Sequence, residues 1–230
     1  MKLIWLGHAS LRIETGNDVI LVDPWLTANP MLEENQYAAA TSGATHILVT
    51  HGHFDHTADV VQISKDTGAP VHGMIELAGF LHDIGAVEGN AYNMGGTIAL
   101  GEAKATLVPA SHSSSIRDGD TSRYMGSPAG YIFEAEGKTV YISGDTTIMA
   151  DMEWIADFYK PTVGILSAGG YYTMPMSGAA YAAKRYFNFE TVIPYHYRTF
   201  PALEQTADKL KEALPGIAVI EPQILEVIEL

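Results

Sequence analysis

Short apolar runs separated by turn residues recur along the whole chain and predict a protein rich in β-strands. Runs of aliphatic and β-branched residues are typical of strands when turn residues bound them. The runs cover residues 3–6, 19–22, 47–50, 105–108, 130–134, 139–143, 163–166, 191–193 and 224–228. Residues 11–13 add a further strand, which we expect to pair with 19–22 as a hairpin across Gly16-Asn17-Asp18.

Helical periodicity falls between some of these strands. The spacing predicts helices over residues 58–67, 75–84, 177–187 and 203–214. Gly68 and Gly85 would end the first two, and Ser177 would cap the third. The mixture of hairpins and alternating strands and helices predicts a layered α/β protein of mixed α+β type.

No linker, repeat or low-complexity segment divides the chain, so one domain over residues 1–230 is expected. A chain of 230 residues with a hydrophobic fraction of 47% can bury a large core without disulfides. The longest weakly patterned stretch is residues 111–128, and unpatterned loops of this length are usually functional or mobile.

Charge and composition limit the class of protein. The chain has 13 basic and 27 acidic residues, a net charge of −14, which disfavours nucleic-acid and anionic-membrane partners. Because there is no cysteine, thiolate metal sites, disulfide scaffolds and cysteine nucleophiles are excluded. We expect neither a secretory signal nor a membrane span, since no apolar run is long enough. A cytoplasmic enzyme or binding domain is expected, and a homo-oligomer stays open.

The densest chemical signal is the hexapeptide His51-Gly52-His53-Phe54-Asp55-His56, directly after the predicted strand 47–50. His51 and His53 are two residues apart, so in extended backbone they project to the same side and can grip one ion. Asp55 and His56 follow where the chain turns toward a helix, and they can bind a second ion. Imidazole with carboxylate suits zinc, iron or manganese.

Three more candidate ligands each follow a predicted strand: His112, Asp145 and His196. Strand ends are where open α/β sheets place ligand sites, because side chains converge there over a rigid scaffold. The sequence therefore predicts that these residues gather around the hexapeptide.

The hexapeptide, then His112, Gly144-Asp145 and His196, resembles the metallo-β-lactamase superfamily in order and spacing, over essentially the whole chain. Residues 5–10, 23–26 and 194–197 are similar to small bacterial metal-dependent hydrolases near ascorbate-6-phosphate lactonase and N-acyl-phosphatidylethanolamine phospholipase D. The resemblance implies a four-layer αβ/βα sandwich, with two facing sheets, helices on both outsides and the site at one edge.

The resemblance also implies two divalent metal ions, with zinc favoured and manganese as the alternative. It assigns His51, His53 and His112 to the first ion, Asp55, His56 and His196 to the second, and Asp145 as the bridge. Two cations flanking a water would lower its pKa toward about 7. We therefore expect a bridging hydroxide that attacks an ester, lactone or similar carbonyl bond of a small molecule. Asp55 and Asp145 are the expected catalytic residues, with Asp55 orienting the hydroxide.

Residues beside these ligands are candidates for contact with the substrate: His8, Arg117, Tyr197 and Arg198. Guanidinium grips phosphate or carboxylate in a bidentate manner, so the two arginines favour an anionic substrate. Ordinary loop surface is the alternative for both arginines, and core packing for Tyr197. His8 would contact the substrate or support a ligand.

Other polar and aromatic residues are assigned less specific roles. Asp23 would accept a ring N–H from a ligating histidine or form a turn with Pro24. Trp25, Tyr171 and Tyr172 would line the pocket or pack in the core. The histidines without a converging pattern, expected to be structural, are His46, His72 and His82.

The same ligands leave other functions open. Phosphodiester hydrolysis is the main alternative, although the net charge and the lack of a basic stripe disfavour a nuclease. Phospholipid cleavage would need a membrane-facing helix, which the sequence does not predict. An iron-dependent redox enzyme and a non-catalytic metal-binding sensor are further alternatives.

Overall fold

The computed structural model describes residues 1–230, and its first sheet has seven strands in the order β16-β1-β2-β3-β4-β5-β6. The strands are β1 (Lys2–Gly7), β2 (Ser10–Thr15), β3 (Asp18–Val22), β4 (His46–Val49), β5 (Val71–Met74), β6 (Glu88–Tyr92) and β16 (Val227–Glu229). The pairs from β16 to β3 are antiparallel, and those from β3 to β6 are parallel. The antiparallel pair β2–β3 confirms the predicted hairpin.

The second sheet also has seven strands, in the order β15-β14-β13-β12-β11-β8-β7. They are β7 (Thr97–Leu100), β8 (Ala103–Pro109), β11 (Ala129–Ala135), β12 (Lys138–Ile142), β13 (Val163–Ser167), β14 (Thr191–Tyr195) and β15 (Ala218–Val219). It repeats the plan of the first sheet, because β7 to β12 pair antiparallel and β12 to β15 pair parallel.

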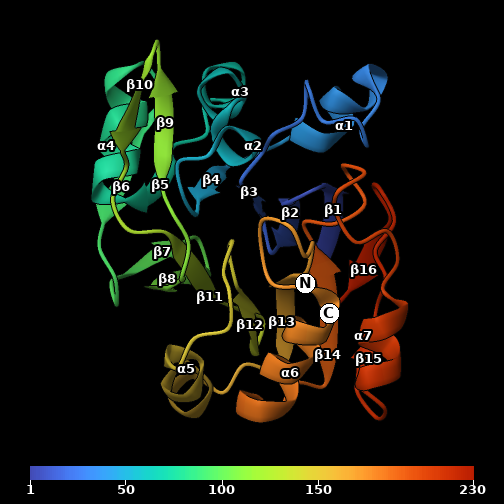
Figure 1. The fold of residues 1–230 in the computed structure, drawn as a ribbon. Coiled ribbons are helices and arrows are strands. Elements are labelled where there is room, and N and C mark those ends of the chain that lie inside the picture. Colours follow the sequence, from blue (N-terminus) through green and yellow to red (C-terminus); the bar gives the residue numbers. More distant parts are fainter.

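The two sheets face each other, and helices cover the outer face of each (Figure 1). Between the sheets, the Tyr131 hydroxyl donates a hydrogen bond to the Val49 carbonyl oxygen at 2.7 Å. The first sheet packs its outer face against α1 (Tyr37–Thr41), α3 (Val60–Thr67) and α4 (Ile75–Asp83), and the second against α5 (Asp151–Tyr159), α6 (Met176–Tyr186) and α7 (Asp208–Ala213). The predicted four-layer sandwich is confirmed.

Most predicted elements are present, with differences at their ends. Helix α3 ends at Gly68, whose φ of 76° closes the helix in the left-handed conformation that glycine favours. Helix α6 begins after Pro175, so the expected cap at Ser177 is wrong: this residue already lies inside the first turn. Only Asp208–Ala213 of the predicted helix 203–214 is helical. The prediction for 224–228 is displaced to β16, Val227–Glu229.

Several elements were not predicted, because they are short or carry apolar residues on their exposed side. Helix α5 exposes Trp154 and Phe158, which hides its periodicity. Strands β5, β6 and β7 are short, as are η1 (Glu34–Gln36) and α2 (Phe54–Thr57). The segment 111–128 contains a separate hairpin of β9 (Ser115–Asp118) and β10 (Thr121–Tyr124). No helix has both the length and the apolar character that crossing a membrane requires.

Candidate metal centre

The carboxyl ends of several strands meet at one edge of the two sheets and carry the candidate ligands. His51 follows β4, His112 follows β8, Asp145 follows β12 and His196 follows β14. Each of these residues lies one to three positions beyond the end of a largely buried strand, which holds its side chain at this edge. The structure brings together all seven residues predicted to bind metal, from both sheets.

The first ligand group is His51, His53 and His112, whose candidate ligand atoms all lie within 4.8 Å of one another. His51 Nε2 lies 3.0 Å from His53 Nδ1. Asp145 Oδ2 lies 3.9 Å from His51 Nε2 and 3.6 Å from His112 Nε2. Zinc–nitrogen bonds of 2.0–2.1 Å in a tetrahedron separate neighbouring ligand atoms by roughly 3.3–3.4 Å, so this group has the spacing of a metal site.

The second ligand group is built around the same Asp145 oxygen. His196 Nε2 lies 3.0 Å and His56 Nε2 lies 3.5 Å from Asp145 Oδ2. Asp55 Oδ2 lies 3.5 Å from His196 Nε2 and 3.7 Å from His56 Nε2. Asp145 Oδ2 is therefore close to nitrogen atoms of both groups.

Several of these atoms are buried without a hydrogen-bond partner: His56 Nε2, His196 Nδ1, His196 Nε2 and Asp145 Oδ1. Buried polar groups are nearly always hydrogen-bonded, so unpartnered ones need an explanation. A cation between the imidazole nitrogens and the carboxylates would satisfy most of them. The residues present therefore fit a metal centre.

The electrostatics of the two groups differ. Burial lowers the pKa of His51 well below its ordinary value, and burial likewise lowers the pKa of His53 and His112. Burial also opposes the charge of His196, but the adjacent Asp145 and Asp55 carboxylates outweigh it and raise the pKa of His196 to about 9. The first group is thus neutral and ready to coordinate, whereas a cation must displace a proton from the second.

Asp23 fixes the orientation of two candidate ligands from behind. The fully buried Asp23 carboxylate accepts hydrogen bonds from His56 Nδ1 at 2.8 Å and from the Thr50 hydroxyl at 2.5 Å. Because the Thr50 hydroxyl gives its proton to Asp23, it accepts from His51 Nδ1 at 3.0 Å. Both histidines therefore donate from Nδ1 and direct Nε2 toward the centre, which leaves Nε2 as the nitrogen that a cation would coordinate. Of the two roles that the sequence left open for Asp23, the structure supports the acceptor role.

His8 lies behind Asp55 and not on the wall of the cavity. Its buried ring donates from Nε2 to Asp55 Oδ2 at 2.8 Å, and Nδ1 lies 2.8 Å from the Thr199 hydroxyl. Burial and the nearby His196 lower the pKa of His8 to about 4, which keeps the ring neutral. The predicted contact of His8 with substrate is corrected: the ring is fully buried, and it positions the Asp55 carboxylate.

The backbone at this edge adopts a conformation that side chains seldom allow. His8, Asp23 and His196 have φ values of 52°, 47° and 59°, and each directly follows or closely follows a strand. Non-glycine residues in the left-handed region cost free energy and persist only where the surrounding structure enforces them, which happens most often at functional sites. The fold therefore imposes the direction of these three side chains.

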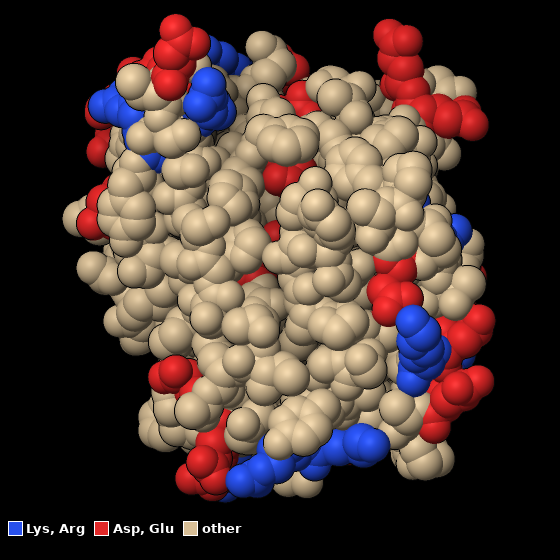
Figure 2. Space-filling view, in the orientation of Figure 1, with Lys and Arg blue, Asp and Glu red and all other residues tan.

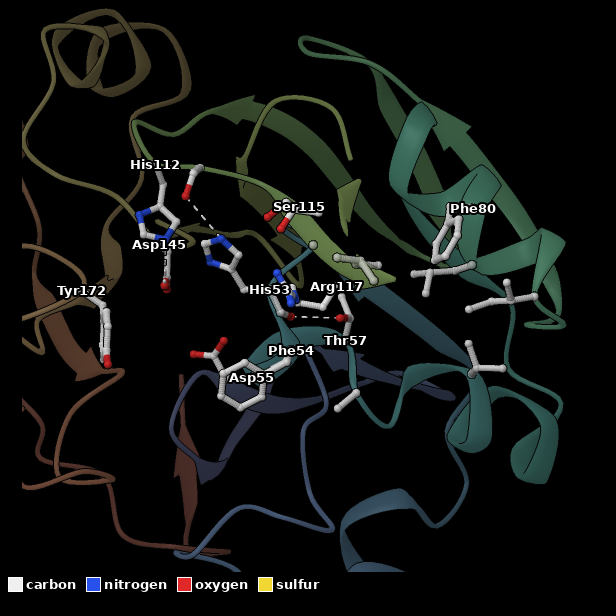
Figure 3. Close-up of a pocket in the computed structure, with 18 of the residues that line it drawn as sticks. His53, Phe54, Asp55, Thr57, Phe80, His112, Ser115, Arg117, Asp145 and Tyr172 are labelled. Carbon is white, nitrogen blue, oxygen red and sulfur yellow. Dashed lines mark hydrogen bonds and ion pairs between the residues drawn. The ribbon is translucent and has the colours of Figure 1, made fainter. Parts of the chain in front are cut away.

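A cavity of about 850 Å³ opens beside the centre and is lined by four of the candidate ligands, His53, Asp55, His112 and Asp145 (Figure 3). Of the residues predicted to contact substrate, only Arg117 lines this cavity. Of the aromatic residues considered for the pocket wall, Tyr172 lines it and Trp25 is buried.

Tyr197 and Arg198 lie away from the cavity. The Tyr197 ring is buried and stacks on Trp5 with ring centroids 5.6 Å apart. The Arg198 guanidinium carbon lies 5.8 Å from the centre of the same Trp5 ring. Neither residue lines the cavity, so their assignment to substrate binding is corrected: the positive φ values of His196 and Arg198, 59° and 68°, turn the chain after β14, and both side chains lie against Trp5.

Sequence reasoning missed several residues at or near the centre: Thr50, Thr199, Phe54, Phe80, Ile116 and Phe200. Phe54 carried the clearest signal, since it lies inside the hexapeptide and is 65% exposed. Phe80 and Ile116 are half-buried residues of the helix α4 and the strand β9, where an apolar residue is ordinarily part of the core. Their presence in the cavity depends on tertiary packing alone.

Comparison with known proteins identifies the family. The model of the β-lactamase superfamily domain matches residues 18–197. The chain belongs to the metallo-β-lactamase superfamily. A metal-dependent hydrolase of Ruegeria sp. (strain TM1040) is 57% identical over 230 residues, all of both chains, and one of Paracoccus denitrificans is 50% identical over the same length. The structure of a metallo hydrolase from Ignicoccus hospitalis has a TM-score of 0.86 at 32% identity, covering 99% of this chain and 97% of that one.

These relatives and the site agree with each other. The chain is a metal-dependent hydrolase of the metallo-β-lactamase superfamily. The predicted superfamily and the predicted enzyme class are both confirmed. His/Asp clusters able to hold metal ions lie where the family motif falls in this sequence.

Proposed function

We propose that the chain binds two divalent ions, with zinc favoured over manganese, and hydrolyses an ester or lactone bond of a small molecule. One observation carries the proposal: a single oxygen, Asp145 Oδ2, lies within 3.0–3.9 Å of imidazole nitrogens from both ligand groups. A carboxylate in that position suits a bridge between two ions.

In this proposal His51, His53 and His112 hold one ion, and Asp55, His56 and His196 hold the other, with Asp145 shared. When bound, such ions act as Lewis acids and bring the pKa of water down to about 7. Asp55 lines the cavity as well as the second ligand group. Its carboxylate is thus able to accept a hydrogen bond from the attacking water, while His8 keeps it in place.

Arg117 supports an anionic substrate. It lines the cavity and forms no ion pair, whereas Arg123 on the same hairpin pairs with Asp118 at 3.3 Å. An unpaired guanidinium beside a metal centre suits a carboxylate or phosphate group. The same residue favours a second candidate function, hydrolysis of a small phosphodiester. The net charge of −14 disfavours nucleic-acid polymers as its substrates.

The experiment that tests the proposal is metal content per chain, measured by elemental mass spectrometry on protein purified without an affinity tag, with His51→Ala alongside. We expect close to two zinc or manganese ions in the wild type and fewer in the variant. Hydrolysis of phenyl acetate, γ- and δ-lactones and bis(p-nitrophenyl) phosphate is then compared on the loaded protein. Iron alone, or one ion per chain, would contradict the proposal, and a preference for the phosphodiester would select the second candidate.

A further inference from the structure

One arm of the cavity is apolar and lies away from the metal ligands. It is lined by Val61 of α3, Phe80 and Leu81 of α4, Ile84 directly after α4, and Ile116 of β9. In Figure 3, Phe80 lies on the side of the cavity opposite His112, Asp145 and Tyr172. The cavity thus joins a polar end at the candidate ligands to an apolar end between α4 and the β9–β10 hairpin. We call this end the apolar arm.

Most of the apolar side chains that line the apolar arm are only partly buried. Leu81 is buried in the core beneath the arm, while Val61, Phe80 and Ile116 are only partly buried against that core. Ile84 is 50% exposed. Contiguous apolar residues that line a concave surface mark a ligand site more often than chance exposure. Figure 2 shows the middle of this face as largely uncharged, with recessed acidic atoms near its centre.

The outer wall of the apolar arm is fixed to the metal-binding segment. Met125, at the end of the hairpin, packs so closely on Gly52 that a Cβ at Gly52 would come within 2.9 Å of the Met125 side chain. The Gly52 N–H also donates to the Ser114 hydroxyl at 3.2 Å. At its other side, the Arg123 guanidinium lies 4.9 Å from the centre of the Phe80 ring and holds the hairpin over α4. The arm is therefore built at a set distance from the candidate ligands.

We propose that the apolar arm binds an unbranched alkyl chain of the substrate, so that the hydrolysed bond belongs to an amphiphile. This inference rests on the proposed function, because it places the reacting bond at the metal centre. The polar end offers Ser113 and Ser115 beside the ligands, and the apolar arm offers the side chains of Val61, Phe80 and Ile116. A short polar substrate would leave that surface wet, whereas an alkyl chain would remove it from water.

The first test measures binding without turnover. Straight-chain hydroxamic acids from two to eight carbons chelate metal through the same head group, and their affinity for the metal-loaded protein is measured by calorimetry. Burial of each methylene is worth about a fourfold gain in affinity. We expect the dissociation constant to fall about fourfold per added methylene until the arm is full. Equal affinity along the series, or affinity that falls with length, would overturn the inference.

Two exposed isoleucines of the same region provide a matched pair of variants. Ile84 lines the apolar arm at 50% exposure, and Ile75, at the start of α4, is 49% exposed and does not line the cavity. Ile84→Asn should weaken binding of the eight-carbon probe about fourfold or more and leave the two-carbon probe unchanged. Ile75→Asn should change neither. Phe80→Ala should shorten the chain length at which affinity levels off, and equal profiles in all three variants would count against the arm.

A second series separates this inference from the proposed function. The kcat/KM of p-nitrophenyl acetate, butyrate, hexanoate and octanoate is measured on the loaded protein. If kcat/KM rises with chain length in the wild type and does not rise in Ile84→Asn, both the proposed function and the apolar arm are supported. Hydrolysis that depends on metal but not on chain length overturns the apolar arm and leaves the proposed function standing. If no ester is hydrolysed but hydroxamate affinity still rises with chain length, the proposed reaction is overturned and the apolar arm stands.

Discussion

The protein contains two clusters of buried or half-buried histidines, and they differ in what their ring nitrogens contact. In the metal centre, His56 Nε2 and His196 Nε2 have no hydrogen-bond partner and lie around the Asp145 carboxylate. In the second cluster, His46 on β4 and His72 on β5 meet, and His46 Nδ1 lies 3.1 Å from His72 Nε2. We call this second cluster the β4–β5 histidine pair.

Both nitrogens of His72 in the β4–β5 histidine pair have protein partners. His72 Nδ1 accepts the backbone N–H of Asn90 at 2.8 Å, so its Nε2 carries the proton and donates it to His46 Nδ1. No carboxylate oxygen lies closer to His46 than Asp18, at 3.9 Å. The comparison teaches that density of histidine does not make a metal site. Ring nitrogens that have no hydrogen-bond partner and gather around a shared carboxylate are what a cation can use.

The largest expected difference between the clusters is in catalysis. Asp145→Ala removes the shared oxygen and should cost one ion and about 10³-fold in kcat/KM, since a catalytic ion supplies several kcal/mol of transition-state stabilisation. His72→Asn, in the other cluster, should keep both ions and the rate. Metal content and ester hydrolysis are measured on both variants. Two retained ions in Asp145→Ala would refute the bridge.

Metal removal should destabilise the fold by the next largest amount. An ion whose free concentration is about 1,000 times its dissociation constant stabilises the folded state by about 4 kcal/mol. A chain of this size loses about 2–4 °C in Tm for each kcal/mol of stability lost. A chelator should therefore lower the Tm by about 8–16 °C, because the buried atoms around Asp145 lose their partner. The drop should be equal in His72→Asn and smaller in Asp145→Ala. An unchanged Tm in the wild type would show that the centre is satisfied without metal.

Changing the support behind a ligand should have a smaller effect. Asp23→Asn places an amide N–H₂ against either the Thr50 N–H or the His56 Nδ1–H, both of which donate to this carboxylate. Metal affinity should fall about 10–100-fold, measured by competition with a chromophoric chelator. Asp18→Asn, next to His46 in the other cluster, is the control and should leave affinity unchanged. Equal metal affinities in the two variants would show that Asp23 does not support the metal ligands.

The smallest expected effect concerns the β4–β5 histidine pair and pH. Burial and the neighbouring His46 lower the pKa of His72 from 6.5 to about 4. The unfolded chain therefore takes up a proton near pH 6.5 that the folded state refuses until about pH 4, so stability falls as pH decreases between these values. From pH 7 to pH 5 the loss should be about 1–2 kcal/mol. Urea unfolding of wild type and His72→Asn at both pH values checks this, and parallel losses would contradict it.

Much of the centre can be predicted from the sequence because its signals are local. The hexapeptide His51–His56 is contiguous, and His112, Asp145 and His196 each follow a buried strand. The strand register then brings the three together at one edge. Tyr197 and Arg198 show where local reasoning fails: proximity to His196 along the chain did not place them at the cavity, because their side chains lie against Trp5.

The sequence by itself determined the set of candidate ligands, because they are contiguous in the hexapeptide or follow predicted strands. The family and its four-layer fold came from the resemblance that these motif residues carry. Only the tertiary structure decided that His8 supports Asp55 and that Asp23 orients His56, since each pair joins a residue that follows a strand of the first sheet to a residue of α2. It also decided the apolar arm, whose walls come from α3, α4 and β9. An apolar residue looks the same in sequence whether it faces the core or a cavity, and only packing distinguishes the two.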